Sequence, residues 1–401
     1  MNQKTVAVLI IVENLPVPID RRVWQEARTL RDAGLRVSII CPKGSGFQKS
    51  RETLEGIEIY RHRLWEASGP LGYLFEYSWA LAAQFLLALR VYARTRFRVL
   101  QACNPPDTIF LIGRFFKLFG VRFIFDHHDL VPELYETKFN RHDLGYKLVC
   151  CAERGTFRTA DVSIATNESY REVALDRGGM RRERTYVVRS CPDLTRIRIL
   201  PSQPALKEGR RHLVVYLGVM GHQDGLDLLL ESIAFIAGLG KSEDTLFVLI
   251  GAGPELPRLK TLASEKRLDA LVKFTGRLPD EDVAAYFSTA AFGVAPDRAT
   301  PMNDKSTMNK ILEYMAFGLP VVLYDLTEGR RSAGDAGLYA RRDDTEDFAR
   351  QILKLLDSDE LRAELGRRAR RRIEESLNWE NEKRALLDAY AAALGESIRL
   401  S

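Results

Sequence analysis

Four consecutive residues near position 307 could bind an anion through their backbone. The stretch Thr300–Asp325 (TPMNDKSTMNKILEYMAFGLPVVLYD) opens with a polar turn at Pro301–Asp304 and continues as a predicted short helix, followed by a buried strand at 321–323. The first N–H groups of a helix have no partner inside it and point at a ligand bound at its N-terminus. Here those groups belong to Ser306, Thr307, Met308 and Asn309, and either Ser306 or Thr307 can also cap the helix.

A carboxylate lies two turns further along this helix, at Glu313. Its position suits the hydroxyl groups of a ribose, so the stretch could bind a nucleotide by its phosphates and its sugar. An ordinary amphipathic helix with a surface glutamate would show the same pattern.

Polar residues also follow two predicted strands in the first half of the chain. Asn104 ends the strand 99–104, and the cluster His127, His128 and Asp129 follows the strand 122–126. Ligands of parallel sheets bind at the carboxyl ends of the strands, so these side chains are candidates for an acceptor or phosphate side of a site. Two adjacent histidines point in different directions and make a poor metal pair. One of them, which we take to be His128, could bond a sugar hydroxyl, and the alternative is a structural histidine.

Basic residues and glycines occupy other loops that follow strands. Arg21 and Arg22 come after a proline-rich loop and could supply positive charge to a phosphate, or they could be surface arginines. Glycines between a strand and a helix let a phosphate approach the backbone, and Gly218 and Gly221 are placed in this way. Arg277 and Leu278 follow the predicted strand 272–275.

The elements that must position these residues alternate regularly between strand and helix. Predicted strands at 5–11, 36–41, 57–61, 99–104, 122–126, 161–166 and 186–189 precede a proline-containing segment, and strands at 213–217, 246–250, 272–275 and 292–295 follow it. This rhythm predicts an α/β fold with parallel sheets, and 401 residues suit two domains. We expect domains at 1–190 and 212–375, a linker at 191–211, and a last helix within 376–401.

Composition limits the class of protein. The net charge of +5 is too small to indicate nucleic-acid binding but would suit an anionic membrane face. Five cysteines without framework spacing are interpreted as reduced cytosolic thiols, and no set of residues has metal-ligand spacing. We therefore expect no metal and no cofactor. The opening apolar run is interpreted as a strand rather than a signal peptide.

Two basic and aromatic segments could lie on a membrane surface. The predicted helix 72–98 ends in four arginines, and residues 114–119 read RFFKLF. The uncharged run 77–89 is shorter than the ~20 residues that span a bilayer. Buried helices with charged ends are the alternative interpretation.

The stretch around Glu313 resembles the donor-binding signature of retaining glycosyltransferases of family 4: Glu, seven residues, Glu, a short apolar run, Gly and Pro. Glu313 matches the second Glu and Gly318–Pro320 matches the end, whereas Lys305 stands at the first Glu. The resemblance covers nearly the whole chain. The segments IVENLPVPIDRRVWQEA, GVMGHQDG and NDKSTMNKILEYMA together are similar to exopolysaccharide or O-antigen transferases.

This resemblance implies the GT-B fold, in which two Rossmann-like domains face each other across a cleft and the C-terminal helix returns to the first domain. The first domain would bind the acceptor and the second the nucleotide sugar. His128 and Asp129 match a His-Asp pair that contacts the transferred sugar, and Arg277–Pro279 matches a loop that holds the nucleotide.

The chain departs from the family at the phosphate positions. Many members have an arginine and a lysine where Val219 and Asp224 stand here, and the first loop lacks their Gly-Gly. We hypothesise that Lys305 carries the phosphate charge, with the helix N-terminus and Arg277 or Lys310.

The implied function is a metal-independent retaining transfer from a nucleotide-diphosphate sugar to a polyprenyl-linked or other saccharide acceptor. Such a protein would act in bacterial exopolysaccharide or lipopolysaccharide synthesis, in the cytoplasm, peripherally on the inner face of the membrane. Two alternatives stay open: a GT-B sugar-nucleotide epimerase, and a non-catalytic scaffold that binds a nucleotide sugar.

Overall fold

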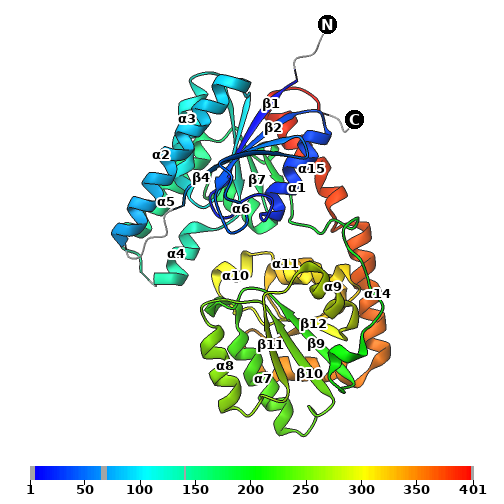
Figure 1. Ribbon diagram of the computed structural model, residues 1–401. Helices are drawn as coiled ribbons and strands as arrows, with labels where there is room; N and C mark the ends of the chain where they lie inside the picture. Colours follow the sequence, from blue (N-terminus) through cyan, green and yellow to red (C-terminus); the bar gives the residue numbers. More distant parts are fainter. Residues whose placement is uncertain (1–4, 65–69, 140, 399–401) are drawn as a thin grey trace. The chain divides into compact units, whose positions relative to one another are not determined.

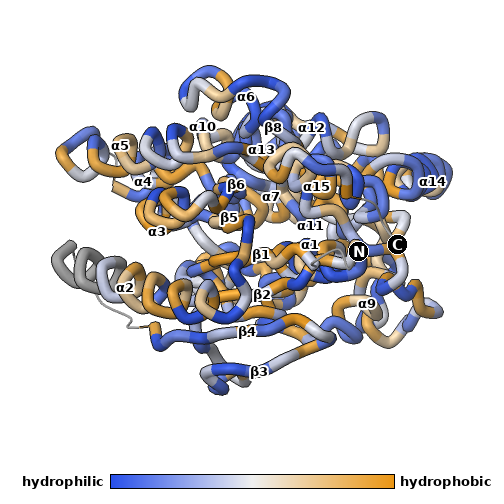
Figure 2. The backbone as a smooth tube through the Cα atoms, turned by 90° about the horizontal axis from the view of Figure 1, so that it is seen from above, coloured by the Kyte–Doolittle hydropathy of each residue, from blue (hydrophilic) through white to orange (hydrophobic). Residues whose placement is uncertain are grey.

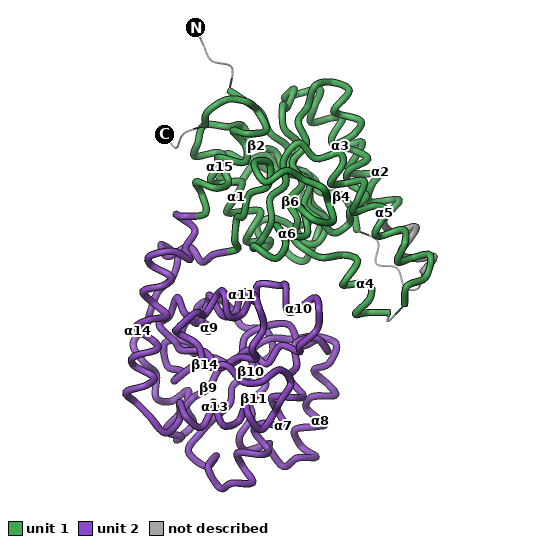
Figure 3. The backbone as a smooth tube through the Cα atoms, turned by 180° about the vertical axis from the view of Figure 1, so that it is seen from behind, with its two compact units in different colours: residues 1–190, 382–401 green, residues 191–381 purple. Residues whose placement is uncertain are grey.

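The computed structural model describes residues 5–64, 70–139 and 141–398. It divides into two compact units, which Figure 3 colours separately. The first unit contains residues 1–190 and 382–401, and the second contains residues 191–381. Each unit has its own sheet, with helices packed against it (Figure 1).

The sheet of the first unit has the strand order β3-β4-β2-β1-β5-β6-β7-β8. All its neighbouring strands are parallel except β3, which pairs with β4 in the antiparallel sense. The strand order reverses at β1, where β2 lies on one side and β5 on the other, and such a point is where α/β sheets hold ligands. The strands are β1 (Ala7–Ile11), β2 (Arg36–Pro42), β3 (Arg51–Leu54), β4 (Ile57–His62), β5 (Val99–Cys103), β6 (Arg122–His127), β7 (Val162–Ala165) and β8 (Thr185–Val187).

Two helices of the first unit, residues 21–32 and 144–159, begin at side-chain caps. The Asp20 side chain accepts a hydrogen bond from the N–H of Val23 at the start of the first helix, and the Asp143 side chain accepts one from the N–H of Tyr146. The helices are α1 (Arg21–Asp32), α2 (Pro70–Thr95), α3 (Phe110–Lys117), α4 (Val131–Phe139), α5 (Leu144–Thr159), α6 (Glu168–Asp176) and most of α15 (Trp379–Leu394).

The last helix, α15, belongs to the core of the first unit although it comes from the far end of the sequence. Leu386 and Tyr390 are fully buried, and the Tyr390 hydroxyl donates a hydrogen bond of 2.6 Å to Oε1 of Gln101 on β5. The backbone N–H of Arg189 also donates to the Glu382 carboxylate at 2.8 Å.

The sheet of the second unit is parallel throughout, with the order β11-β10-β9-β12-β13-β14. Its strands are β9 (His212–Leu217), β10 (Thr245–Ile250), β11 (Val272–Gly276), β12 (Phe292–Ala295), β13 (Val321–Tyr324) and β14 (Gly337–Ala340). Its helices are α7 (Leu226–Gly238), α8 (Leu256–Glu265), α9 (Asp280–Thr289), α10 (Pro301–Lys305), α11 (Asn309–Ala316), α12 (Thr327–Ala333), α13 (Thr345–Asp357) and α14 (Asp359–Glu375). The order reverses at β9, which lies between β10 and β12.

Two local predictions were wrong. Pro301–Asp304 is not a turn but part of the short helix α10, because the Thr300 side chain accepts from the N–H of Asn303 and Pro301 occupies the first helical turn. The following helix α11 begins at Asn309, and its N-cap residue is Met308, whose side chain makes no capping bond. Ser306 is instead the C-cap of α10.

The segment 191–211, expected as a linker, is fastened to the second unit. The N–H groups of Leu200 and Gln203 donate to the hydroxyls of Ser288 and Thr289 at the end of α9, both at 2.9 Å.

Candidate functional site

The strongest candidate site in the second unit surrounds the ammonium group of Lys310. This side chain is only 8% exposed, and its Nζ lies 2.6 Å from Oδ1 of Asp297 and 3.7 Å from Oδ1 of Asp224. The ring of Tyr216 lies beneath it, with 5.0 Å from Nζ to the ring centroid. One cation is therefore held between two carboxylates against an aromatic face.

The sheet explains why these residues meet. Asp224 follows β9 and Asp297 follows β12, and the two strands are parallel neighbours, so their carboxyl ends meet at one edge. Lys310 stands in the first turn of α11. Tyr314, one turn later, anchors this helix to the sheet, because its hydroxyl accepts from the N–H of Leu217 at 2.7 Å and donates to the carbonyl of Val294 at 3.2 Å.

The cluster carries one more carboxylate than cations. Burial raises the pKa of Asp224, and Asp297 raises it further, while Lys310 acts in the opposite direction. Oδ2 of Asp224 accepts a hydrogen bond of 3.0 Å from the N–H of Gly221. Oδ2 of Asp297 is buried without a hydrogen-bond donor in the described part of the chain. Uptake of a proton by Asp224 would balance the charge of the cluster and allow Lys310 to face an anion.

The glycines next to this cluster serve close packing rather than ligand contact through their own N–H groups. The N–H of Gly218 donates to the carbonyl of Ile250 at 3.0 Å, and that of Gly221 is bound by Asp224. A Cβ atom on Gly251, where φ is +137°, would lie 1.8 Å from the carbonyl oxygen of Gly218. The loops that follow β9 and β10 can therefore touch only because position 251 is glycine.

The N-terminus of α11 retains part of the predicted anion site. The Ser306 N–H donates to the carbonyl of Asn303 at 3.2 Å, so it is already used. The N–H groups of Met308 and Asn309 have no acceptor among the described residues, and they lie two positions and one position before Lys310. Thr307 directly precedes Met308, and Lys305 is the last residue of α10.

The remaining predicted donor-side residues surround this region in the fold of the second unit. Glu313 lies on the half-buried side of α11, whose other side is buried in the core. Arg277 is exposed after β11, and no acceptor binds its guanidinium in the described part of the chain. Leu278 packs against the core and so has a structural role.

The first unit has a comparable cluster around Arg22 at the carboxyl ends of β5 and β6. The Arg22 guanidinium lies 2.8 Å from Oδ1 of Asp126 and 3.1 Å from Oε1 of Glu26, and it donates to the carbonyl of Val188 at 2.6 Å. Arg22 is buried, so it is not the free phosphate-binding arginine that the sequence suggested. Arg21, its neighbour, is exposed.

His128 is held by this cluster. Its Nε2 lies 2.8 Å from Oδ2 of Asp126 and 3.0 Å from Nε of Arg22. Burial would lower the pKa of His128, but the Asp126 carboxylate outweighs it and the pKa is raised. The same carboxylate has a lowered pKa, because the charges of Arg22 and His128 outweigh its burial. The Nε–H of Arg22 donates to Nε2 of His128, and a proton on Nε2, which the raised pKa favours, would make Nε2 a hydrogen-bond donor to the Asp126 carboxylate.

Asn104 fixes the loop that carries His128. Its Oδ1 accepts from the N–H groups of His128 at 2.7 Å and Asp129 at 3.1 Å, and its Nδ2 donates to the carbonyl of Asp129 at 2.8 Å. Asn104 thus positions the loop. Burial raises the pKa of the Asp129 carboxyl.

His127 points the other way, into an aromatic core. Its ring stacks on Phe125 with 5.0 Å between centroids and meets Phe157 and Tyr170 at 5.4 and 5.1 Å. Burial lowers the pKa of His127 to about 3. The predicted role of His127 on the acceptor side is therefore replaced by a structural one.

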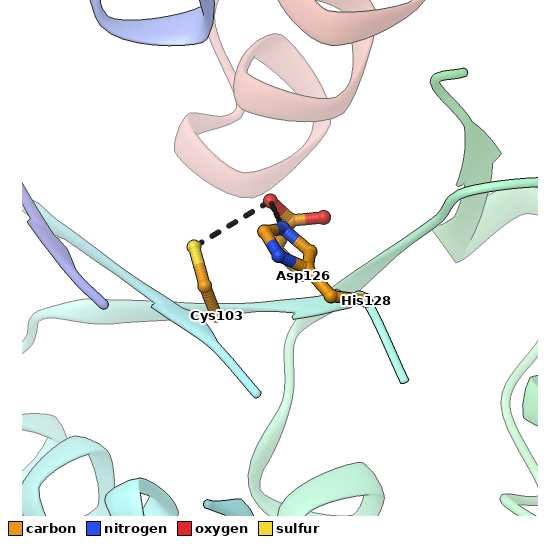
Figure 4. Close-up of side chains that lie close together, drawn as sticks. All are labelled: Cys103, Asp126 and His128. Carbon is orange, nitrogen blue, oxygen red and sulfur yellow. Dashed lines mark hydrogen bonds and ion pairs between the residues drawn. The ribbon is translucent and has the colours of Figure 1, made fainter. Parts of the chain in front are cut away.

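Cys103, Asp126 and His128 form a possible metal-binding group, with their ligand atoms within 4.8 Å of one another (Figure 4). Both oxygens of Asp126 are already bonded, to Arg22 and to His128. Burial and the neighbouring carboxylates raise the pKa of Cys103, which opposes the thiolate that a metal needs. The positive charge of the Arg22 guanidinium, which is bonded to Asp126, would also repel a metal cation. Cys103, Asp126 and His128 therefore do not fit a metal ion.

Asp297, Asp126 and Glu26 were not predicted from the sequence as site residues. A signal for the first two was present, since each lies within two residues of the end of a predicted strand. Glu26 lies in the middle of a helix and has no such signal.

Family models match both halves of the chain. A glycosyl transferase 4-like domain matches residues 19–191, and the glycosyl transferases group 1 model matches residues 211–358. The chain belongs to the glycosyltransferases.

Individual relatives agree with this assignment. The putative colanic acid biosynthesis glycosyltransferase WcaL of Escherichia coli is 25% identical over 241 residues, which are 59% of this chain and 58% of WcaL. The chain spans about half the length of the curated relatives that it matches.

Solved structures show the same fold. Sucrose-phosphate synthase from Thermosynechococcus elongatus superposes with a TM-score of 0.78 over 97% of this chain and 99% of that chain, at 18% identity. Anabaena HepE, in complex with UDP-glucose, superposes with a TM-score of 0.73 over 96% of this chain and 99% of that chain, at 14% identity. The glycosyltransferase thus has the two-domain GT-B fold that the resemblance implied.

Proposed function

We propose that this glycosyltransferase moves a sugar from a nucleotide-diphosphate donor to a saccharide acceptor, and that Lys310 supports the leaving diphosphate. The observation that carries the proposal is the buried ammonium of Lys310 beside the N-terminus of α11, at the strand-order reversal of the second sheet. Negative charge grows on the diphosphate as the sugar leaves, and preorganised donors in a water-poor site stabilise it most effectively.

Other residues have distinct parts in this proposal. The N–H groups of Met308 and Asn309 add donors to the phosphate side, and Glu313 binds the ribose. Lys305 and Arg277 are further cations for the phosphates. The family resemblance assigns His128 the contact with the transferred sugar, and the raised pKa of its imidazole supports a donor role. Retention of configuration and independence of metal also rest on the resemblance.

The donor and acceptor classes come from similar proteins. HepE has been solved with UDP-glucose, and WcaL is named for colanic acid biosynthesis. We infer a nucleotide sugar as the donor, and a polyprenyl-linked saccharide of a bacterial cell-surface polysaccharide as the acceptor. The protein would then act in the cytoplasm, at the inner face of the membrane.

A thermal-unfolding screen with UDP, GDP, ADP, dTDP and their common sugars tests the proposal, with EDTA in one arm and Mg²⁺ in the other. A ligand present at 100 times its Kd stabilises the native state by about 2.7 kcal/mol, which raises the unfolding midpoint. We expect one nucleotide to do so equally in both arms. No shift with any nucleotide would contradict the proposal.

Product analysis separates the proposal from its rivals. With the donor identified, incubation without acceptor should give slow hydrolysis at most. Accumulation of a different free nucleotide sugar would identify an epimerase. Donor binding with neither hydrolysis nor transfer to any lipid-linked saccharide would identify a scaffold.

A further inference from the structure

The first unit has a cationic groove between α3 and α5, far in sequence from the donor-binding segment. The groove has a volume of about 750 Å³, and its charged lining residues are Arg114, Lys117, Lys147, Arg154 and Arg158. None of the lining residues is acidic. Gly155 lets the two helices approach, since a Cβ atom there would lie 2.7 Å from the ring of Phe110.

Most of this positive charge is not neutralised by the protein. Lys117 is used internally, because it bonds Asp161 at 3.0 Å and the carbonyl of Thr159 at 2.8 Å. Arg114, Lys147, Arg154 and Arg158 are exposed, and none forms an ion pair or a side-chain hydrogen bond within residues 5–64, 70–139 and 141–398. The Glu153 carboxylate, next to Arg154 in the chain, is itself bonded to Arg177 at 2.6 Å. Four free cations around one hollow favour a ligand with several negative charges.

Exposed leucines border the groove on both helices. Leu118 at the end of α3 is 80% exposed, and Leu144 and Leu148 on α5 are 71% and 62% exposed. On α5 these leucines alternate with Lys147, Cys151, Arg154 and Arg158 at spacings of three and four, so one outward face is both apolar and basic. Figure 2 shows hydrophobic and hydrophilic residues mixed along α3 and α5.

The helix α2 extends the same flank. Phe85 of α2 packs edge-on against Phe115 of α3, with 4.9 Å between ring centroids, and the views in Figures 1 and 3 place α2, α3 and α5 together. On its outer side α2 exposes Leu86 and Arg90. None of the described helices is long and apolar enough to cross a bilayer.

We propose that the groove and its leucine border, Leu118, Leu144 and Leu148, dock on an anionic phospholipid surface. The four free cations would bind lipid phosphates, and the leucines would enter the boundary between headgroups and acyl chains. A nucleic acid would also be attracted by the cations, but it would not account for the three exposed leucines. It is usually bound through aromatic side chains that stack on bases, and none of the described groove residues is an exposed aromatic residue. The proposal is independent of the donor chemistry, because membrane binding is measured without nucleotide.

Vesicle sedimentation with the full chain tests the proposal. We expect binding to vesicles of phosphatidylcholine with about one third phosphatidylglycerol, weak binding to pure phosphatidylcholine, and loss of binding as salt screens the charges. Arg154→Glu/Arg158→Glu should weaken binding to anionic vesicles at least tenfold. Arg367→Glu/Arg371→Glu on α14 is the matched control, because it makes the same change in net charge at two exposed arginines of the second unit.

The leucines give a second, independent measurement. Leu144→Ser/Leu148→Ser should weaken vesicle binding severalfold without changing its salt dependence, because it removes apolar contact and no charge. Equal losses in the groove and control arginine variants would overturn the proposal, as would undiminished binding by both groove variants. Preference for heparin or free inorganic phosphate over vesicles would also overturn it. Unchanged unfolding midpoints would show that the variants are folded.

Discussion

Each unit buries one cation between two carboxylates at the carboxyl ends of its central strands, but the two clusters differ in how completely the cation is bonded. Arg22 in the first unit bonds Asp126, Glu26 and the carbonyl of Val188. Lys310 in the second unit has one close carboxylate, Asp297. A planar guanidinium presents five N–H donors in a fixed geometry, and the acceptors around Arg22 match that geometry. The compact ammonium group of Lys310 can instead reorient toward a new anion.

The contrast between the Arg22 and Lys310 clusters shows that burial of a charge does not by itself indicate a ligand site. Arg22 is saturated and holds His128 in place, so its role is to position another residue. Lys310 keeps bonding capacity, lies beside two N–H groups without acceptors, and faces a carboxylate, Asp224, whose pKa is raised. Substitutions in the two clusters should therefore have different effects on stability and on activity.

Asp126→Ala should destabilise the protein most. It leaves the buried Arg22 with Glu26 as its one remaining acidic partner among the described residues, and breaking a buried ion pair from one side costs about 3–5 kcal/mol. Urea unfolding should show a lower midpoint with an unchanged slope. A loss below ~1 kcal/mol would mean that the Arg22 cluster relaxes or admits water, and would break the comparison.

The double variant Lys310→Gln/Asp297→Asn should keep the fold but lose activity by about 100-fold, the effect of removing one preorganised oxyanion donor. It removes the closest ion pair as a unit and leaves Asp224, whose raised pKa allows that carboxyl to take up a proton. Affinity for the nucleoside diphosphate should fall while affinity for the nucleoside stays unchanged, as calorimetry can measure.

Lys305→Ala, measured beside that double variant, assigns the phosphate charge. If Lys305 carries it, as the sequence suggested, turnover should be abolished in Lys305→Ala. Near-normal turnover in this variant would leave Lys310 as the principal cation.

Asp224→Asn should strengthen binding of the diphosphate severalfold, because it removes the excess negative charge next to Lys310. In the wild type, binding should strengthen as pH falls, since the raised pKa lets Asp224 take up a proton near the ligand's charge. The variant should lack this contribution. Weaker binding by Asp224→Asn would show that the carboxylate holds Lys310 in its active position instead.

Between neutral pH and pH 5.5, the free energy of unfolding should decrease by about 1 kcal/mol less in His127→Phe than in the wild type. The folded protein holds the pKa of His127 at about 3, well below the unfolded value, so its contribution is present above pH ~6.5 and is lost as pH falls. His128, whose pKa is raised, contributes with the opposite sign, and only the difference between wild type and variant isolates His127. Sugar transfer should be unaffected.

Glu26→Gln should have the smallest effect, within ~0.5 kcal/mol near neutral pH. Burial and the neighbouring Asp126 raise the pKa of Glu26, which favours the neutral form of its side chain, and glutamine is neutral with nearly the same shape. A large loss would mean that both carboxylates around Arg22 are ionised.

Much of the fold follows from sequence, because buried parallel strands are continuous apolar runs and glycines end the helices between them. Ala7–Ile11 and Val321–Tyr324 are examples. The antiparallel edge strand Arg51–Leu54 was missed, because RETL lacks an apolar pattern and is defined by its pairing with β4. Helix α4 was missed for a related reason, since its polar sequence VPELYETKF shows little periodicity.

The site was only partly predictable because sequence indicates which loops reach the edge of a sheet but not which side chains bond there. His127 and His128 are neighbours with the same side chain, yet one enters an aromatic core and the other a charge cluster. Arg22 looks like a surface arginine until Asp126, from a strand about a hundred residues later, is placed beside it. The role of Lys310 likewise becomes apparent only when Asp297 and Asp224 are placed beside its ammonium group.

The return of α15 to the first unit sets an order for folding during synthesis. Residues 1–190 leave the ribosome long before Glu382, and until then Gln101 lacks the Tyr390 hydroxyl and the core lacks Leu386. The second unit, in contrast, is contiguous in sequence and can close as soon as it has been made. The first unit therefore completes its core after the second unit, although it is synthesised first. While the second unit is being made, the apolar surface that α15 later covers stays exposed on the first unit and is available to chaperones.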